Sequence, residues 1–167
     1  RLSRRIFKWY GVLENRSGLI ATITLPQGGE LQFTCVHLRL RFGTPQLRRD
    51  EFDSIISSQD PALKNIICGD FNILELPHIS ILNWLSGGKF SDFVFWKRER
   101  NSFGKRFSEL KLQNSLKGKL THLIAFSQVD HILIPDDFVV NKTKVLKAKI
   151  GSDHNPVMVE VDSFSTV

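Results

Sequence analysis

The sequence is poor in the residues that mark secreted disulfide scaffolds and membrane spans. It has only two cysteines, Cys35 and Cys68, and both lie in apolar stretches. Two thiols are too few for the disulfide framework of a small secreted domain, so we expect both to be buried and free. No run of about 18 apolar residues occurs, which excludes a membrane-spanning helix. The hydrophobic content of 41% instead suits a packed globular core.

The start of the chain lacks an initiator methionine and a secretion signal. The single methionine is Met158, and the basic residues 1–12 are not followed by an apolar segment with a small-residue cleavage site. We therefore expect a fragment or a processed product of a longer chain. The lack of a signal favours a cytoplasmic location.

The formal net charge is +6, and much of it lies in one segment. Residues 97–119 contain eight Lys or Arg and two Glu. Because Phe103 and Phe107 also lie there, one interpretation is a surface for nucleic acid or another polyanion, with Lys105 and Arg106 as substrate-binding residues. The alternative is a solvated loop, since the segment shows no clear periodicity.

Apolar periodicity predicts several strands and two helices around a sheet-on-sheet core. Gly28 and Gly29 predict a hairpin and therefore antiparallel pairing. Thr44 is the predicted N-cap of an amphipathic helix at 44–58. A second, short helix is predicted at 77–88. Strands are predicted at 19–25, 31–38, 65–71, 90–96, 128–135, 143–151 and 155–163.

Two predicted strands end in residues suited to binding a phosphate or a metal ion. His37 lies at the end of one predicted strand. Asp70 and Asn72 lie at the end of a second, buried strand. Asp70 and Asn72 are two positions apart, so on a strand they point to the same face and can reach one ion or one phosphate. Taken alone, each has an ordinary interpretation, a structural histidine for His37 and a turn for Asp70.

Further polar residues lie in the last two motifs of the chain. Asp130 stands in an apolar strand, where an unpaired carboxylate is costly, so we expect His154 as its partner. Asp153 directly precedes His154. If all these strand ends converge, their oxygen ligands suit Mg²⁺ or Mn²⁺, and a histidine beside an aspartate suits acid–base work or phosphate binding. The remaining histidines are interpreted as structural: His78, His122 and His131.

Four motifs, in this order, resemble the endonuclease/exonuclease/phosphatase superfamily: CVHL at 35–38, CGDFN at 68–72, VDHIL at 129–133 and GSDHNPVMVEV at 151–161. The GDFN motif alone is weak, but the ordered set is specific and covers nearly the whole chain. The resemblance implies an α+β fold, a four-layer αββα sandwich of the deoxyribonuclease I type. Its active site would lie at one end of the packed sheets.

The resemblance also implies roles at a metal-dependent phosphoesterase site. Asp70 and Asn72 would orient the attacking water, the scissile phosphate or a metal ion. Asp153 would be a metal ligand, together with Asp70. Water would attack the phosphorus ester in line, and Mg²⁺ or Mn²⁺ would neutralise the developing charge.

The histidines have implied roles as well. His154, held by Asp130, would serve as general base or as a donor to the phosphoryl oxygens, and His37 would bind the phosphate. The superfamily often has an arginine followed three residues later by glutamine, where this chain has Arg48 and Glu51. Neither of those two is therefore assigned to catalysis.

The chain departs from the superfamily on its N-terminal side. The usual opening strand with an asparagine and helix with a metal-binding glutamate do not appear, and Glu14 precedes a turn. We therefore expect residues 1–167 to form a single, N-terminally incomplete domain that lacks its first strands and helix. A missing segment or a partner chain would complete it, and the chain alone would be weakly active or inactive.

Two functions follow from these observations. The first is a divalent-metal-dependent phosphoesterase acting on phosphodiester or phosphomonoester bonds, with nucleic acid as the leading substrate and phosphoinositides open. The second is a non-catalytic module on the same fold that binds nucleic acid or a partner. A plain basic nucleic-acid-binding domain would leave the pairing of GDFN with SDHNP unexplained.

Overall fold

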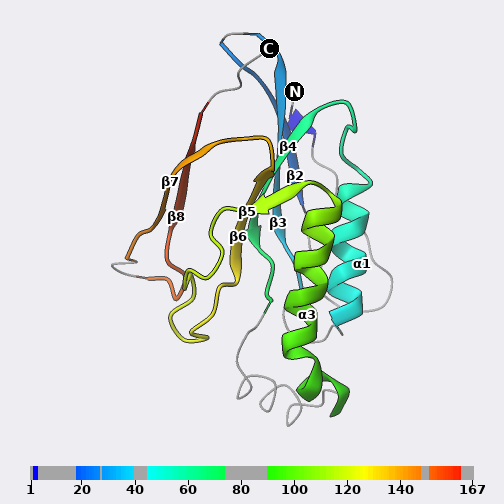
Figure 1. Cartoon of the computed structure of the whole chain (residues 1–167), viewed down its shortest axis with the longest axis vertical. Helices are drawn as coiled ribbons and strands as arrows, with labels where there is room; N and C mark the ends of the chain where they lie inside the picture. Colours follow the sequence, from blue (N-terminus) through cyan, green and yellow to red (C-terminus); the bar gives the residue numbers. More distant parts are fainter. Residues whose placement is uncertain are drawn as a thin grey trace.

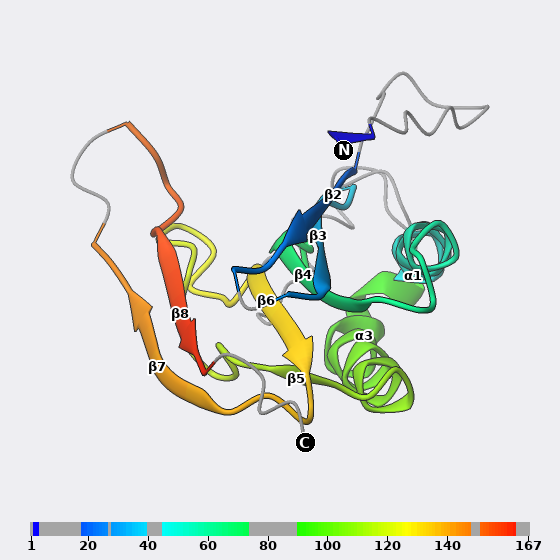
Figure 2. The same cartoon turned by 90° about the horizontal axis from the view of Figure 1, so that it is seen from above.

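A computed structural model describes residues 2–3, 18–26, 28–39, 45–73, 90–147 and 151–162 (Figure 1). Within these ranges, two helices cover one face of a six-stranded sheet, and a two-stranded sheet lies on its other side (Figure 2). These are three of the four layers predicted. No helix in the described ranges is long and apolar enough to cross a membrane. The elements are β1 Leu2–Ser3, β2 Leu19–Thr24, β3 Glu30–His37, α1 Pro45–Ile56, β4 Lys64–Asp70, α3 Phe90–Glu109, β5 Leu112–Asn114, β6 Asp130–Pro135, β7 Val140–Val145 and β8 Val157–Val161.

The six-stranded sheet has the order β1-β2-β3-β4-β6-β5. β2 and β3 form the predicted antiparallel hairpin, in which Leu25 N–H donates to the Gly29 carbonyl at 3.0 Å. β4 lies in the middle, parallel to β3 and antiparallel to β6. A strand in that position is covered on both faces, which explains why its sequence is continuously apolar rather than alternating. The strands predicted around β2, β3, β4, β6 and β8 are thus confirmed.

The main core lies between the helices and the sheet. The rings of Phe52, Phe71, Phe103 and Phe107 pack with centroids 5.5–6.3 Å apart. These four rings come from α1, the end of β4 and α3, so they tie both helices to the middle of the sheet. A smaller apolar cluster that includes Leu31, Ile66, Ile134 and Phe138 packs on the opposite face, against β7 and β8.

The strand predicted at 90–96 and the loop considered for the basic residues after it were wrong. The stretch 90–96, predicted as a strand, and the basic residues 97–109 form the single helix α3. The helical period is seen at Phe103, Phe107 and Leu110, which are spaced by four and three residues. Phe103 and Phe107 are buried against the core and form its apolar side. The bulk of the basic segment is therefore not a solvated loop.

Other expectations were met in part. The helix predicted at 44–58 is α1, whereas its N-cap Thr44 and the helix predicted at 77–88 lie outside the described residues. The strand predicted at 143–151 begins earlier, as β7. Both cysteines are free, but they are not buried: Cys35 is exposed and Cys68 is half-buried, on neighbouring strands where β7 and β8 do not cover them fully.

Candidate functional site

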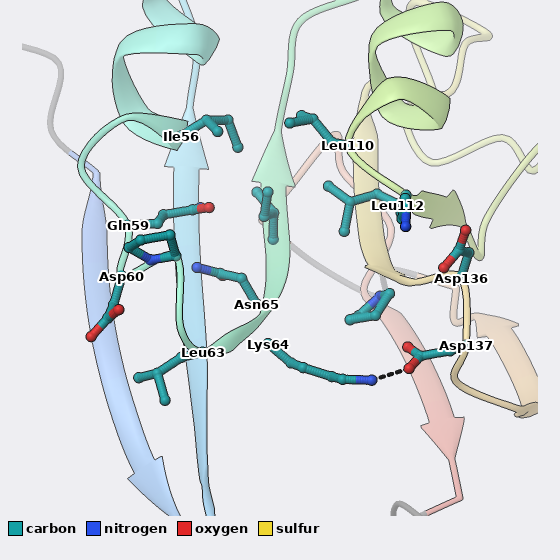
Figure 3. A pocket seen from close by; sticks show the side chains of 14 residues that line it. Ile56, Gln59, Asp60, Leu63, Lys64, Asn65, Leu110, Leu112, Asp136 and Asp137 are labelled. Carbon is teal, nitrogen blue, oxygen red and sulfur yellow. Dashed lines mark hydrogen bonds and ion pairs between the residues drawn. The ribbon is translucent and has the colours of Figure 1, made fainter.

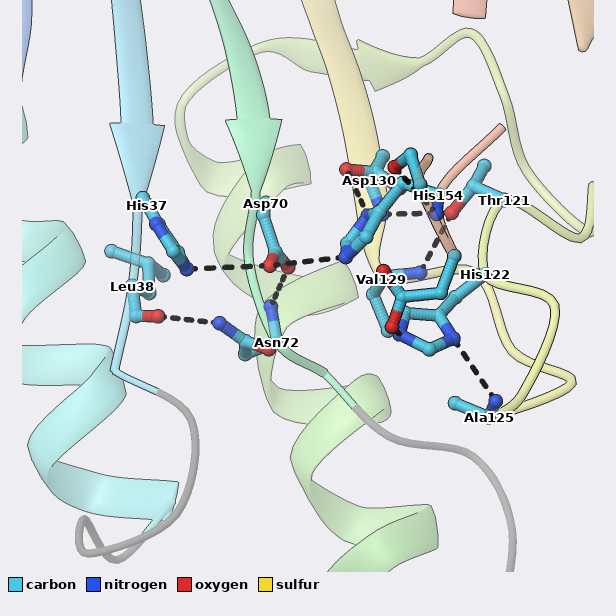
Figure 4. A network of polar contacts seen from close by, with 12 residues as sticks. His37, Leu38, Asp70, Asn72, Thr121, His122, Ala125, Val129, Asp130 and His154 are labelled. Carbon is cyan, nitrogen blue, oxygen red and sulfur yellow. Dashed lines mark hydrogen bonds and ion pairs between the residues drawn. The ribbon is translucent and has the colours of Figure 1, made fainter. Parts of the chain in front are cut away.

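Three strands bring their polar ends to the same end of the six-stranded sheet (Figure 4). β3 and β4 are parallel and pair His37 with Asp70 at their last residues. β6 runs the other way, and its first residue, Asp130, pairs with Asp70. Residues that pair directly on neighbouring strands project to the same face. The three side chains therefore meet on the face that carries the two-stranded sheet.

A line of contacts joins these residues to His154. The Nε2 atom of His37 lies 3.5 Å from Oδ2 of Asp70, and the same oxygen lies 4.0 Å from Nε2 of His154. Nδ1 of His154 lies 2.9 Å from Oδ2 of Asp130, the partner expected for it. Because Nδ1 faces a carboxylate, it carries a proton, and Nε2 is the atom directed at Asp70.

The backbone at Asp130 is also held in place. The hydroxyl oxygen of Thr121, which is fully buried, accepts hydrogen bonds from the N–H groups of Val129 and Asp130 at 3.0 and 2.9 Å. These two bonds hold the backbone at the point where β6 begins and so help to orient the Asp130 carboxylate. Partial burial acts to lower the pKa of His154, but the hydrogen bond that its Nδ1–H donates to Asp130 and the charges of Asp130, Asp70 and Asp153 outweigh it and raise that pKa.

The residues around Asp70 adopt an unusual backbone. Gly69 has φ +135°, and a Cβ atom there would lie 1.9 Å from the carbonyl oxygen of Val36. Asn72 has φ 52°. Its N–H donates to Oδ1 of Asp70 at 2.8 Å, and its Nδ2 donates to the Leu38 carbonyl at 2.6 Å. Burial raises the pKa of Asp70, opposed by the Asn72 N–H and reinforced by the charge of Asp130.

His122 belongs to this region although its sequence suggested an ordinary structural residue. Its Nδ1 accepts a hydrogen bond from the Ala125 N–H at 3.0 Å, and its Nε2 lies 3.2 Å from Oδ2 of Asp153. Its ring packs on that of His154 with centroids 4.5 Å apart. No local motif distinguishes His122. The signal is its backbone pairing with residue 154, which exists only in the folded chain.

The donors present fit a hard cation better than a transition metal. His122, Asp153 and His154 bring one potential ligand atom each to within 4.8 Å of the others. However, Nδ1 of His122 is occupied by an N–H donor, so its Nε2 carries a proton and donates to Asp153 instead of binding a metal. The carboxylates of Asp70 and Asp130, adjacent and partly buried, create an excess of negative charge that a divalent cation would neutralise.

The structure does not bring Lys105 and Arg106 into these contacts. Both lie on α3, where the guanidinium of Arg106 bonds Asp53 at 2.7 Å and Glu109 at 3.2 Å. Lys105 is exposed. His131 points away from Asp130, into the core between Phe71 and Phe107, as strand alternation predicts.

A pocket at the opposite end of β4 is separate from this site (Figure 3). It lies where α1 and α3 end, and Lys64, the first residue of β4, forms an ion pair there with Asp137. Asp70 is the last residue of the same strand, so the length of β4 separates the two places. The walls of this pocket contain no histidine among the described residues, whereas the strand-end cluster, the candidate active site, has three.

No family model matches the chain, and no curated protein matches it in sequence. Solved structures do match. An endonuclease/exonuclease/phosphatase protein from Beutenbergia cavernae is similar with a TM-score of 0.61 and 16% identity, over 88% of this chain and 39% of its own. D. rerio TDP2 complexed with a single-strand DNA product gives 0.59 and 14%, over 97% and 68%.

A third match is the inositol polyphosphate 5-phosphatase domain of spSynaptojanin with inositol (1,4)-bisphosphate and a calcium ion. It has a TM-score of 0.61 and 15% identity over 95% of this chain and 53% of its own. The chain thus spans between about two fifths and two thirds of the length of these structures. The fold predicted from the sequence is confirmed, and the chain has the α+β fold of the endonuclease/exonuclease/phosphatase proteins.

Proposed function

We propose that this chain carries the phosphate-binding and proton-handling part of a divalent-metal-dependent phosphoesterase, which hydrolyses phosphodiester or phosphomonoester bonds by in-line attack of water. The observation that supports it most is the line of contacts from His37 through Asp70 and His154 to Asp130, at 3.5, 4.0 and 2.9 Å. Such a line supplies a carboxylate for a water molecule beside two imidazoles for a phosphate.

In this proposal, the side chains divide the work of binding and proton transfer. Asp70 orients the attacking water, and the Asn72 N–H holds the Asp70 carboxylate in place. Asp130 fixes the tautomer of His154, so that Nε2 faces the phosphate and, when protonated, donates to a phosphoryl oxygen. His37, which is exposed on the other side of Asp70, binds a second phosphate oxygen.

Asp70 and Asp153 are the residues proposed to hold the metal ion. Asp153 has a half-exposed carboxylate, one oxygen of which is oriented by His122, so the other is available as a ligand. Hard oxygen donors of this kind suit Mg²⁺ or Mn²⁺. When bound, the ion would neutralise the negative charge that develops on the phosphoryl oxygens.

Nucleic acid is the substrate that we propose first. The net charge of +6 favours a polyanion, and a fold neighbour, TDP2, was solved with a single-strand DNA product. Phosphoinositides are the other polyanion to be tested, because the spSynaptojanin neighbour contains an inositol bisphosphate.

The test is hydrolysis of a single-stranded oligonucleotide and of a soluble inositol polyphosphate, with Mg²⁺, with Mn²⁺ and with EDTA. The chain should be assayed alone and extended upstream in its parent protein, since we expect weak activity from residues 1–167. His154→Gln and Asp70→Asn should each lower kcat by at least about 100-fold. The matched control is Glu30→Gln, at the far end of β3, which should leave kcat unchanged.

A non-catalytic binding module is the second candidate. The observation that favours it concerns glutamates: in the part of the chain that the structure describes, Glu51 accepts from the Arg39 N–H and Glu99 is ion-paired with Arg48. Both carboxylate oxygens of Glu99 accept from Arg48, so Glu99 is not available to complete a metal site. Metal-independent binding of the oligonucleotide, with no turnover by the extended protein, would establish this alternative and refute the phosphoesterase.

A further inference from the structure

An open pocket lies behind the candidate active site, between α3 and the segment that follows it through β5. His131 forms part of its wall, and Asp130, the preceding residue of β6, belongs to the site. Successive residues of a strand project to opposite faces of a sheet. The pocket and the candidate active site therefore lie back to back across β6.

The pocket is strongly cationic. Arg100 and Lys105 from α3, Lys111 from the turn before β5 and Lys117 from the turn after it all line the pocket, and the single carboxylate among its lining residues is that of Asp136. Four cations around one concavity repel one another unless an anion is bound between them.

Three of these cations are not engaged elsewhere. The side chains of Lys105, Lys111 and Lys117 are exposed, and among the described residues none of them forms an ion pair. Arg106 differs, because its guanidinium is bonded to Asp53 and Glu109. Within the basic segment noted in the sequence, Arg106 thus holds the two helices together, whereas Lys105, Lys111 and Lys117 line the pocket.

One residue of the pocket wall, His131, also has a buried polar atom without a partner among the described residues. The Gly118 N–H donates to Oε1 of Gln128, which fixes the orientation of that amide and directs its NH₂ group at Nδ1 of His131, 3.3 Å away. The Nε2 atom of His131 is buried and has no partner among the described residues. A buried polar atom without a partner is uncommon.

We propose that this pocket binds phosphate groups of a nucleic-acid backbone, as a second contact that holds the polymer while a phosphate occupies the site on the other side of β6. The choice of nucleic acid rests on the proposed function. The aromatic residues of the lining, Phe103 and Phe107, are buried and offer no platform for stacking bases. Recognition is therefore of the backbone, independent of base sequence.

The experiment is a fluorescence-anisotropy titration of a labelled single-stranded oligonucleotide into the full chain, over a range of salt concentrations. Asp70→Asn in every variant prevents hydrolysis. The pocket variant is Lys105→Ala with Lys117→Ala, and the control of equal charge is Lys142→Ala with Lys144→Ala, on β7. The salt dependence is the slope of log K against log salt concentration. Loss of two phosphate contacts should reduce the magnitude of this slope by about 1.4, which corresponds to a roughly 25-fold weaker affinity at 0.1 M salt.

The control should keep the wild-type slope. Equal effects of the pocket and control variants would overturn the proposal, because the attraction would then come from net charge alone. Binding to vesicles with phosphoinositide and none to the oligonucleotide would overturn it as well. If the pocket variant has the reduced slope but the extended, unsubstituted protein never hydrolyses the oligonucleotide, the pocket stands and the proposed function fails.

Discussion

Replacing Gly69 with alanine would test how the site is held between β3 and β4. A Cβ atom at this position would lie 1.9 Å from the carbonyl oxygen of Val36, whereas ordinary contacts are 3.4–4 Å. The carbonyl belongs to the backbone of the neighbouring strand, so no side-chain rotation can relieve the overlap. The two strands would have to separate at the residues that pair His37 with Asp70.

The magnitude has two parts. A φ of +135° is a conformation that residues with a Cβ rarely adopt, and it costs about 1–3 kcal/mol. Overpacking against a fixed backbone costs about another 1–3 kcal/mol. We therefore expect Gly69→Ala to lower the free energy of unfolding by about 2–6 kcal/mol, a large share of the roughly 5–15 kcal/mol typical of a domain.

Urea unfolding followed by circular dichroism would measure this loss, with Gly118→Ala as the matched control. Gly118 also has a positive φ, +78°, but nothing lies within 4 Å of its Cβ position. The control should cost about 1–2 kcal/mol, from backbone strain alone. If Gly69→Ala costs no more than Gly118→Ala, the close approach of the two strands does not constrain this position and our account of the glycine is wrong.

Three further predictions concern stability. Gly104→Ala, at an exposed position of α3 with open space around it, should raise the free energy of unfolding by about 0.5–1 kcal/mol in urea; a loss would contradict the helix. Glu99→Leu should lower it by about 3–5 kcal/mol by removing the carboxylate that pairs with the buried Arg48 guanidinium, and adding Arg48→Met should restore much of the loss in the same assay. Burial, and next the charge of Arg100, lowers the pKa of His131 to about 3. In the unfolded chain the pKa of a histidine is about 6.5. The free energy of unfolding should therefore decrease as the pH falls below 6.5, by up to about 1.4 kcal/mol per pH unit. Urea unfolding at pH 7, 6 and 5 should show a smaller decrease with pH for His131→Gln than for the unsubstituted chain.

The motif at the end of β4 could be interpreted from the sequence because its four residues have separate local tasks. Gly69 permits the close approach of β3, and Asp70 presents a carboxylate at the end of the strand. Phe71 is fully buried, and Asn72 reverses the backbone while bonding the Leu38 carbonyl. The sequence pattern raised the meeting of Asp70 with residues of β3 and β6 only as a condition, and the family resemblance implied that they share one site.

The errors arose where one residue type fits two kinds of element. Aromatic residues are favoured in strands, so residues 90–96 resembled a strand when seen in a short window. The period of α3 becomes clear only when Phe103 and Phe107 are included, and the charges between them obscured it. Burial of Cys35 was also inferred from apolar neighbours in sequence, although alternate residues of that strand face opposite layers with different coverage.

His122 marks the limit of inference from one sequence. It is separated by 31 residues from Asp153, yet the backbone N–H of Leu123 bonds the Asp153 carbonyl at 2.9 Å, and the N–H of Asn155 bonds the Thr121 carbonyl at 2.7 Å. These two bonds lock the loop around His122 onto the segment that carries His154. The imidazole can donate to the Asp153 carboxylate only because this pairing exists. The residue that orients a proposed metal ligand is therefore set by tertiary structure, and a pattern of residue types within either segment could not have identified it.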